Sequence, residues 1–217
     1  MIKFCHISPT PFLETFSHLN GAHLILAHLV EADERYASFY RNLDDGKPKI
    51  MDNSAFEMFK HGKPMYPSEK LAELGEKCAT DYIVLTDYPK DDWQRTRDKA
   101  IEMIGPVTEA GFGTFYVPQS KLGDMDGLIK SIGWALENPQ IDLIGLSILA
   151  APIACGVNES TFHSGGRSDA YKLQRFLSRW RVFSELKRGG YLKEEALDRF
   201  HCLGMVDGPN EIDLLKP

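Results

Sequence analysis

The chain has 217 residues, of which 43% are hydrophobic and 26% are charged, and this length and composition suffice for a buried core. The net charge of -6 excludes a protein that is basic over its whole surface. The four cysteines are widely spaced and include no C-x-x-C pair, which argues against a zinc knuckle and for a reducing compartment. No apolar run approaches the roughly 20 residues of a membrane span, and no secretory leader is recognised, so we expect a cytoplasmic protein without a membrane partner.

Apolar segments and helical segments alternate along the chain. The predicted strands are residues 2–7, 23–27, 49–51, 82–85, 114–117, 142–148 and 200–205. The predicted helices are 12–18, 31–41, 68–79, 91–110, 126–137, 167–188, 194–199 and 209–215, with Ser68 as the N-cap of the third. A loop that contains glycine and serine is expected from 151 to 166.

Most of the predicted strands are continuous apolar runs, which are typical of parallel sheets buried on both faces. Seven such units favour an α/β fold of the (β/α)8 TIM-barrel type, incomplete at its C-terminus, with one barrel domain over residues 1–217. A doubly wound open sheet is the alternative. Because an open barrel edge exposes unpaired backbone groups, we expect a second subunit or another segment to cover it.

Two carboxylates, Asp52 and Asp87, stand where predicted strands end. In barrels and open α/β sheets, ligands bind outside the carboxyl ends of the strands, so both residues are candidates for a site. The other interpretation is structural. Asp52 would then cap the helical turn that follows it, Asp87 would be a turn residue, and Phe56, Met58 and Phe59 would belong to the core.

Five segments between about residues 48 and 215 resemble motifs of a known family, in the same order and with similar spacing. DNSAFE at 52–57 is similar to the DSGGFQ motif of the tRNA-guanine transglycosylase superfamily, and DYIVLTD at 81–87 is similar to its strand ending in a base-binding aspartate. YVPQ at 116–119, IGLS at 144–147 and HCLGM at 201–205 are similar to its glutamine, glycine-pair and Leu-Met-Gly segments. The chain most resembles the short, zinc-free members that phages encode.

The resemblance implies an enzyme that exchanges guanine for a 7-deazaguanine base in DNA, rather than in tRNA, without a cofactor or a metal. Asp52 would be the catalytic acid/base, in the host cytoplasm if a phage encodes the chain. The base-binding residues would be Ser54, Phe56, Asp87, Gln119, Gly145, Ser147, Gly204 and Met205.

These residue types fit that chemistry. A carboxylate stabilises the positive charge that develops on the sugar, and a carboxylate or an amide accepts hydrogen bonds from the edge of the base. A glycine lets the backbone approach the flat base, and a methionine or phenylalanine stacks on its face. A base within a duplex must flip out to reach such a pocket.

The family's nucleophilic aspartate lies on a strand beyond the last segment that this chain matches. Three interpretations stay open: the nucleophile lies beyond Pro217, Asp52 itself attacks, or the chain is a non-catalytic homologue that binds nucleic acid or a purine. A metal-dependent barrel hydrolase that uses Asp52, Asp87 and His28 is a further alternative, although no H-x-H spacing at one strand end favours a metal site.

Basic residues concentrate in the predicted helix 167–188, where Asp169 and Glu185 are the only acids and Tyr171 and Trp180 are interleaved. Phosphate contacts dominate the affinity of proteins for nucleic acids. The candidate contacts to a DNA or tRNA backbone are therefore Arg167, Lys172, Arg175, Arg179 and Arg181. A solvated helix face with i,i+4 ion pairs is the alternative.

Overall fold

The structure, a computed structural model, describes residues 5, 7–19, 21–157, 169–204 and 208–215. The chain divides into two compact units, Met1–Thr86 with Ala100–Phe115 and Asp87–Lys99 with Tyr116–Pro217. The division falls within helix α6 (Trp93–Glu109) and strand β4 (Gly113–Tyr116). The single domain expected over 1–217 stays a prediction.

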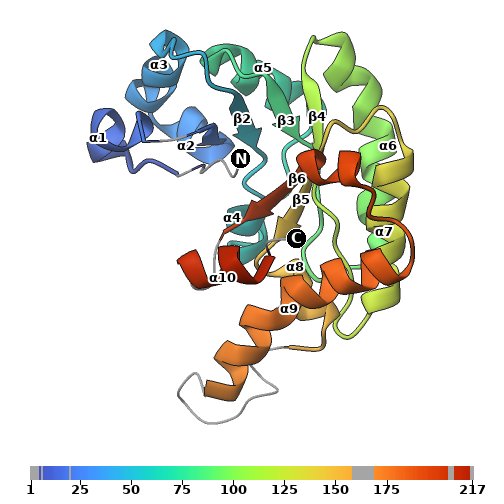
Figure 1. The fold of residues 1–217 in the computed structure, drawn as a ribbon. Coiled ribbons are helices and arrows are strands. Elements are labelled where there is room, and N and C mark those ends of the chain that lie inside the picture. Colours follow the sequence, from blue (N-terminus) through green and yellow to red (C-terminus); the bar gives the residue numbers. More distant parts are fainter. Residues whose placement is uncertain (1–4, 6, 20, 158–168, 205–207, 216–217) are drawn as a thin grey trace. The chain divides into compact units, whose positions relative to one another are not determined.

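Parallel strands run through the first unit in the order β1 (His23–Leu26), β2 (Lys49–Asp52), β3 (Tyr82–Val84) and β4 (Figure 1). Their register sets Ile25 against Met51 and Met51 against Ile83. The other elements of this unit are η1 (Thr10–Phe12), α1 (Leu13–Ser17), α2 (Ala27–Ala32), α3 (Glu34–Asn42), α4 (Ala55–Lys60), α5 (Ser68–Cys78) and the second half of α6.

The core of the first unit lies between its strands and helices α3 and α5, which pack against each other. Ile25, Met51 and Ile83 are completely buried on neighbouring strands. The Tyr36 hydroxyl accepts a hydrogen bond from the backbone N–H of Leu26 at 3.3 Å, which holds α3 against β1.

The second unit pairs two parallel strands, β5 (Leu143–Ser147) and β6 (Phe200–Leu203), with Ile144 against Phe200. Its other elements are the first half of α6, α7 (Met125–Glu137), α8 (Ala150–Ala154), α9 (Asp169–Arg188), the 3-10 helix η3 (Glu194–Arg199) and α10 (Gly208–Leu215) (Figure 1). Its buried core comprises Leu128, Ile132, Leu146, Ala151, Ala154, Val182 and Leu186.

An α/β fold with parallel strands is confirmed, and six of the seven predicted strands are found with bounds shifted by at most two residues. The remaining strand, 2–7, falls largely outside the described residues. The complete barrel, its seventh unit and the covered edge stay predictions. Among the described residues, none of the helices is both long enough and apolar enough to traverse a bilayer.

Three local predictions were wrong. The helix 31–41 is divided at Asp33, whose carboxylate accepts the backbone N–H of Arg35 at 2.9 Å and so caps α3. Ser68 is the first helical residue of α5, with Pro67 before it, and not its N-cap. The loop 151–166 begins inside helix α8, whose five residues are all buried.

Candidate functional site

The turn after β2 holds Asp52 in a fixed orientation. The backbone N–H of Ser54 donates to Asp52 Oδ1 at 2.7 Å, and the backbone N–H of Ala55 donates to Asn53 Oδ1 at 2.8 Å. The Asn53 amide also donates to the carbonyl oxygen of Leu85 at 2.7 Å, which ties the turn to the segment after β3. Asp52 thus lies at a strand end, as predicted, and has one oxygen engaged by the backbone.

The backbone of Ser54 is strained, and a histidine holds it in place. Its φ of 56° and ψ of 29° lie in the left-handed region, which costs a residue other than glycine about 1–3 kcal/mol. Leu26 pairs with Asp52 across the strands, so His28 and Ser54, two residues further along, come together. Ser54 Oγ accepts the His28 backbone N–H at 3.2 Å and lies 2.8 Å from His28 Nδ1, to which its O–H can donate.

Burial and the negative charge of Asp52 affect the pKa of the Cys5 thiol. Burial, and then the negative charge of Asp52, raise the pKa of the Cys5 thiol to about 12. The thiol therefore stays protonated at neutral pH, and Cys5 is not an activated nucleophile.

In the second unit, Asp87 and Gln119 form a buried pair. Asp87 lies three residues beyond the end of β3 and Gln119 three residues beyond the end of β4. The side chains are 4% and 3% exposed, and Gln119 Nε2 donates to Asp87 Oδ2 at 2.6 Å. Sequence patterns indicated both residues but not the bond between them.

An ion pair and a cation–π contact stabilise the segments that carry this pair. Lys121 Nζ lies 2.8 Å from Asp92 Oδ2, so the chain two residues past Gln119 is joined to the N-terminal end of α6. The Arg95 guanidinium lies 3.9 Å from the centre of the Tyr88 ring, a cation–π contact next to Asp87.

The other predicted base-binding residues have different structural surroundings. Gly145 is buried within β5, and the Ser147 hydroxyl accepts the backbone N–H of Leu149 at 3.1 Å. Gly204 has a φ of +69°, and a Cβ there would lie 3.0 Å from the Ile148 side chain. Met205 lies outside the described residues.

Arg179 is not available for phosphate contact, so that prediction was wrong. Its side chain is 2% exposed and bonds to Glu211 at 2.7 Å, to the Leu146 carbonyl at 3.1 Å and to the Leu203 carbonyl. The residue shares the buried face of α9 with Val182, and a buried guanidinium requires partners of this kind.

The remaining basic residues of α9 have mixed surroundings. Lys172 pairs with Asp169 at 3.3 Å, while Arg175 and Arg181 are half-buried. Arg167 lies outside the described residues. The predicted backbone-binding face is therefore smaller than the sequence pattern indicated.

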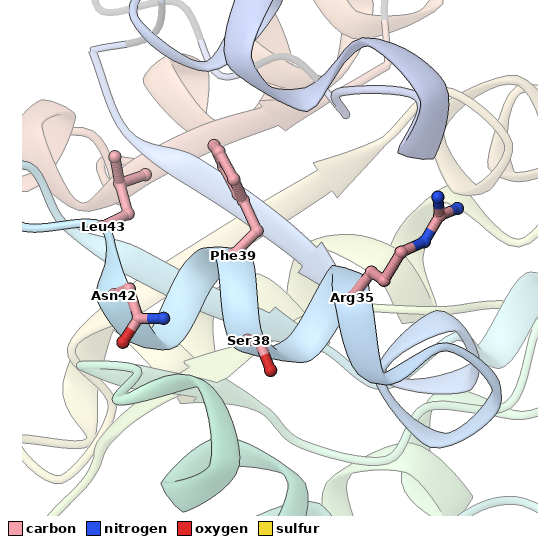
Figure 2. A pocket seen from close by; sticks show the side chains of 5 residues that line it. All are labelled: Arg35, Ser38, Phe39, Asn42 and Leu43. Carbon is pink, nitrogen blue, oxygen red and sulfur yellow. The ribbon is translucent and has the colours of Figure 1, made fainter.

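The pocket in Figure 2 belongs to another part of the first unit. It has a volume of about 440 Å³ and is lined by Arg35, Ser38, Phe39, Asn42 and Leu43. None of the candidate site residues lines it. Across the described segments, no group of three or more His, Cys, Asp or Glu side chains is arranged to hold a metal ion.

Comparison of the chain with protein-family models and with curated protein sequences finds no match. The transglycosylase resemblance therefore stays a prediction from the motifs.

The strain at Ser54 predicts that a glycine variant at this position is more stable than an alanine variant. Ser54→Ala and Ser54→Gly both remove the hydroxyl, but only glycine relieves the left-handed backbone, so the Gly variant should be more stable by about 1 kcal/mol. Urea unfolding measures the difference. The same pair of substitutions at Ser38, inside α3, should give the opposite order. An Ala variant at position 54 that is as stable as the Gly variant would contradict the assigned strain.

The burial of Arg179 predicts a large loss of stability. Arg179→Met leaves Glu211, which is 1% exposed, without its guanidinium, and should lower the free energy of unfolding by about 3–5 kcal/mol. Arg181→Met on the same helix is the control, and a half-buried position should lose much less. The double variant Arg179→Met with Glu211→Leu should regain most of the loss. Equal losses at 179 and 181 would count against the buried pair.

Proposed function

We propose that the chain is a transglycosylase that binds a guanine-type base through Asp87 and Gln119 and exchanges it at a glycosidic bond of DNA. The observation that carries the proposal is the buried pair of a carboxylate and an amide, joined at 2.6 Å. The motif resemblance supports the same assignment, because it places a base-binding aspartate and a glutamine at these two positions.

The pair suits the hydrogen-bonding edge of guanine. Guanine presents an N1–H and an exocyclic amine, both donors, and a carboxylate accepts several hydrogen bonds. The amide of Gln119 supplies a donor for the carbonyl oxygen of the base. Because both side chains are almost completely buried, hydrogen bonds made there are stronger than in water. This edge is the same in guanine and in 7-deazaguanine, so the pair would accept both.

The exchange needs two proton transfers. The bond between C1′ of the sugar and N9 of guanine breaks, and guanine leaves with the electron pair and gains a proton. The incoming base loses a proton as it bonds to C1′. Asp52 has the role of acid/base that the resemblance implies, and its fixed orientation in the turn after β2 supports that role. Direct attack by Asp52 and attack by another nucleophile are both compatible with this assignment.

Calorimetry with free bases tests the recognition step. The wild type should bind guanine and 7-deazaguanine, should bind hypoxanthine more weakly because it lacks the exocyclic amine, and should reject adenine. Asp87→Asn should weaken guanine binding about tenfold or more, since a hydrogen bond to a charged group contributes about 1.5–3 kcal/mol.

Ser131→Ala is the matched control for this experiment. It removes another buried hydrogen bond of the same unit, the 2.7 Å contact between the hydroxyls of Ser131 and Tyr116, and should leave purine binding unchanged. Equal affinity of the wild type for guanine and adenine, or no purine binding at all, would overturn the assignment of the pair.

Incorporation of labelled guanine or 7-deazaguanine tests the exchange itself. The wild type should label single- or double-stranded DNA more than tRNA. Asp52→Asn should lower the rate at least a hundredfold, the order expected for loss of a general acid/base, while purine binding is retained. Purine binding by the wild type without incorporation into DNA or tRNA would make the chain the non-catalytic purine-binding homologue instead.

A further inference from the structure

Two aromatic rings on helix α4 are half exposed. Phe56 is 49% exposed and Phe59 is 47% exposed, whereas Met58 between them is 5% exposed. The structural interpretation, which places all three in the core, therefore holds for Met58 and not for the two phenylalanines. Side chains three residues apart share a helix face, so the two rings are presented on one side of α4.

Basic side chains follow the rings directly. Lys60, His61 and Lys63 are exposed, and Glu57 is the only acid between residues 55 and 66. The backbone N–H of Lys63 donates to the Met58 carbonyl at 2.9 Å, so the chain folds back on the end of α4 and keeps these residues beside the helix. None of the three makes an ion pair with any residue that the structure describes.

The α4 surface comprises Phe56, Phe59, Lys60, His61 and Lys63, and it differs from the part of α9 whose basic residues are paired. On α9, Arg179 is bonded to Glu211, Lys172 pairs with Asp169, and Arg188 pairs with Glu185. Surfaces that bind single strands combine exposed aromatic rings with basic side chains, and Lys60 and Lys63 supply such side chains without an ion-pair partner among the described residues.

We infer that the α4 surface binds unpaired nucleotides of a single-stranded nucleic acid, with bases stacked on the two phenyl rings and phosphates near the basic side chains. A duplex conceals the faces of its bases, so the rings require a strand that is already unpaired. Phe56 follows Asp52 by four residues, so the nucleotides held there would lie close to the carboxylate that the proposed function makes the acid/base. That last step, and only that step, rests on the proposed function.

The test is the fluorescence anisotropy of labelled oligodeoxythymidine and oligouridine, titrated with the full chain at several salt concentrations. Phe59→Leu keeps an apolar side chain but removes the aromatic face, and should weaken binding about tenfold or more. Phe16→Leu is the matched control, because Phe16 is 41% exposed on α1 and carries the same substitution. The control should bind like the wild type.

The salt dependence tests the basic residues. Lys60→Gln with Lys63→Gln should reduce the slope of log affinity against log salt by about 1.4, because each phosphate contact to a single strand contributes about 0.7. Lys172→Gln with Lys187→Gln on α9 should leave the slope unchanged. These exposed substitutions leave the fold intact, which a thermal melt verifies.

The inference is overturned if the wild type does not bind either oligonucleotide, or if the α9 variant loses the slope while the α4 variants do not. A preference for thymidine or uridine strands assigns the substrate to DNA or RNA and supports the inference in either case. Purine binding at Asp87 with unchanged oligonucleotide binding in the α4 variants would reject this surface and retain the proposed function. If those variants lose oligonucleotide binding and the wild type binds no purine, the α4 surface is retained and the proposed function is rejected.

Discussion

The parallel register of β1 and β2 is the constraint on which the turn around Asp52 depends. Because Leu26 lies opposite Asp52, the residues that leave the two strands run side by side, and His28 reaches Ser54. A slip of one residue would move every side chain of one strand to the other face of the sheet and separate this pair. The orientation of Asp52 is therefore set by long-range strand pairing, through the Ser54 backbone that His28 holds.

The hydrogen bonds of this turn oppose the strain in the backbone of Ser54. A left-handed serine costs about 1–3 kcal/mol, and each net hydrogen bond contributes about 0.5–1.5 kcal/mol. The turn makes hydrogen bonds from Ser54 to Asp52, from Ala55 to Asn53 and from Asn53 to the carbonyl of Leu85, besides the contacts with His28. Together they are of the same order as the cost, which is consistent with serine at a position where glycine is the usual residue.

Much of the fold could be predicted because buried parallel strands have continuous apolar runs in their sequences. The ends of strands, and hence Asp52 and Asp87, follow from the same pattern. The role of a charged residue is harder to predict, because the sequence of a helix does not show which residues pack against its basic side chains. Arg179 finds its partner in Glu211, 32 residues away, and only the folded chain shows that they meet. Phe56 and Phe59 are the opposite case, since apolar residues of a short helix can remain at the surface.

The bond between Gln119 and Asp87 has a consequence for selectivity. Under the proposed function, a base that displaced the amide from Asp87 Oδ2 would gain only the difference between its new hydrogen bonds and the one it displaces. The hydrogen bonds of a base with two donors along one edge would outweigh the one that is lost. A base without an N1–H would leave the buried carboxylate of Asp87 with too few hydrogen bonds. In the proposed function, the bond between the two side chains would make binding of a base with the wrong donors unfavourable. Such an arrangement discriminates through the penalty on the wrong ligand as much as through the attraction of the right one.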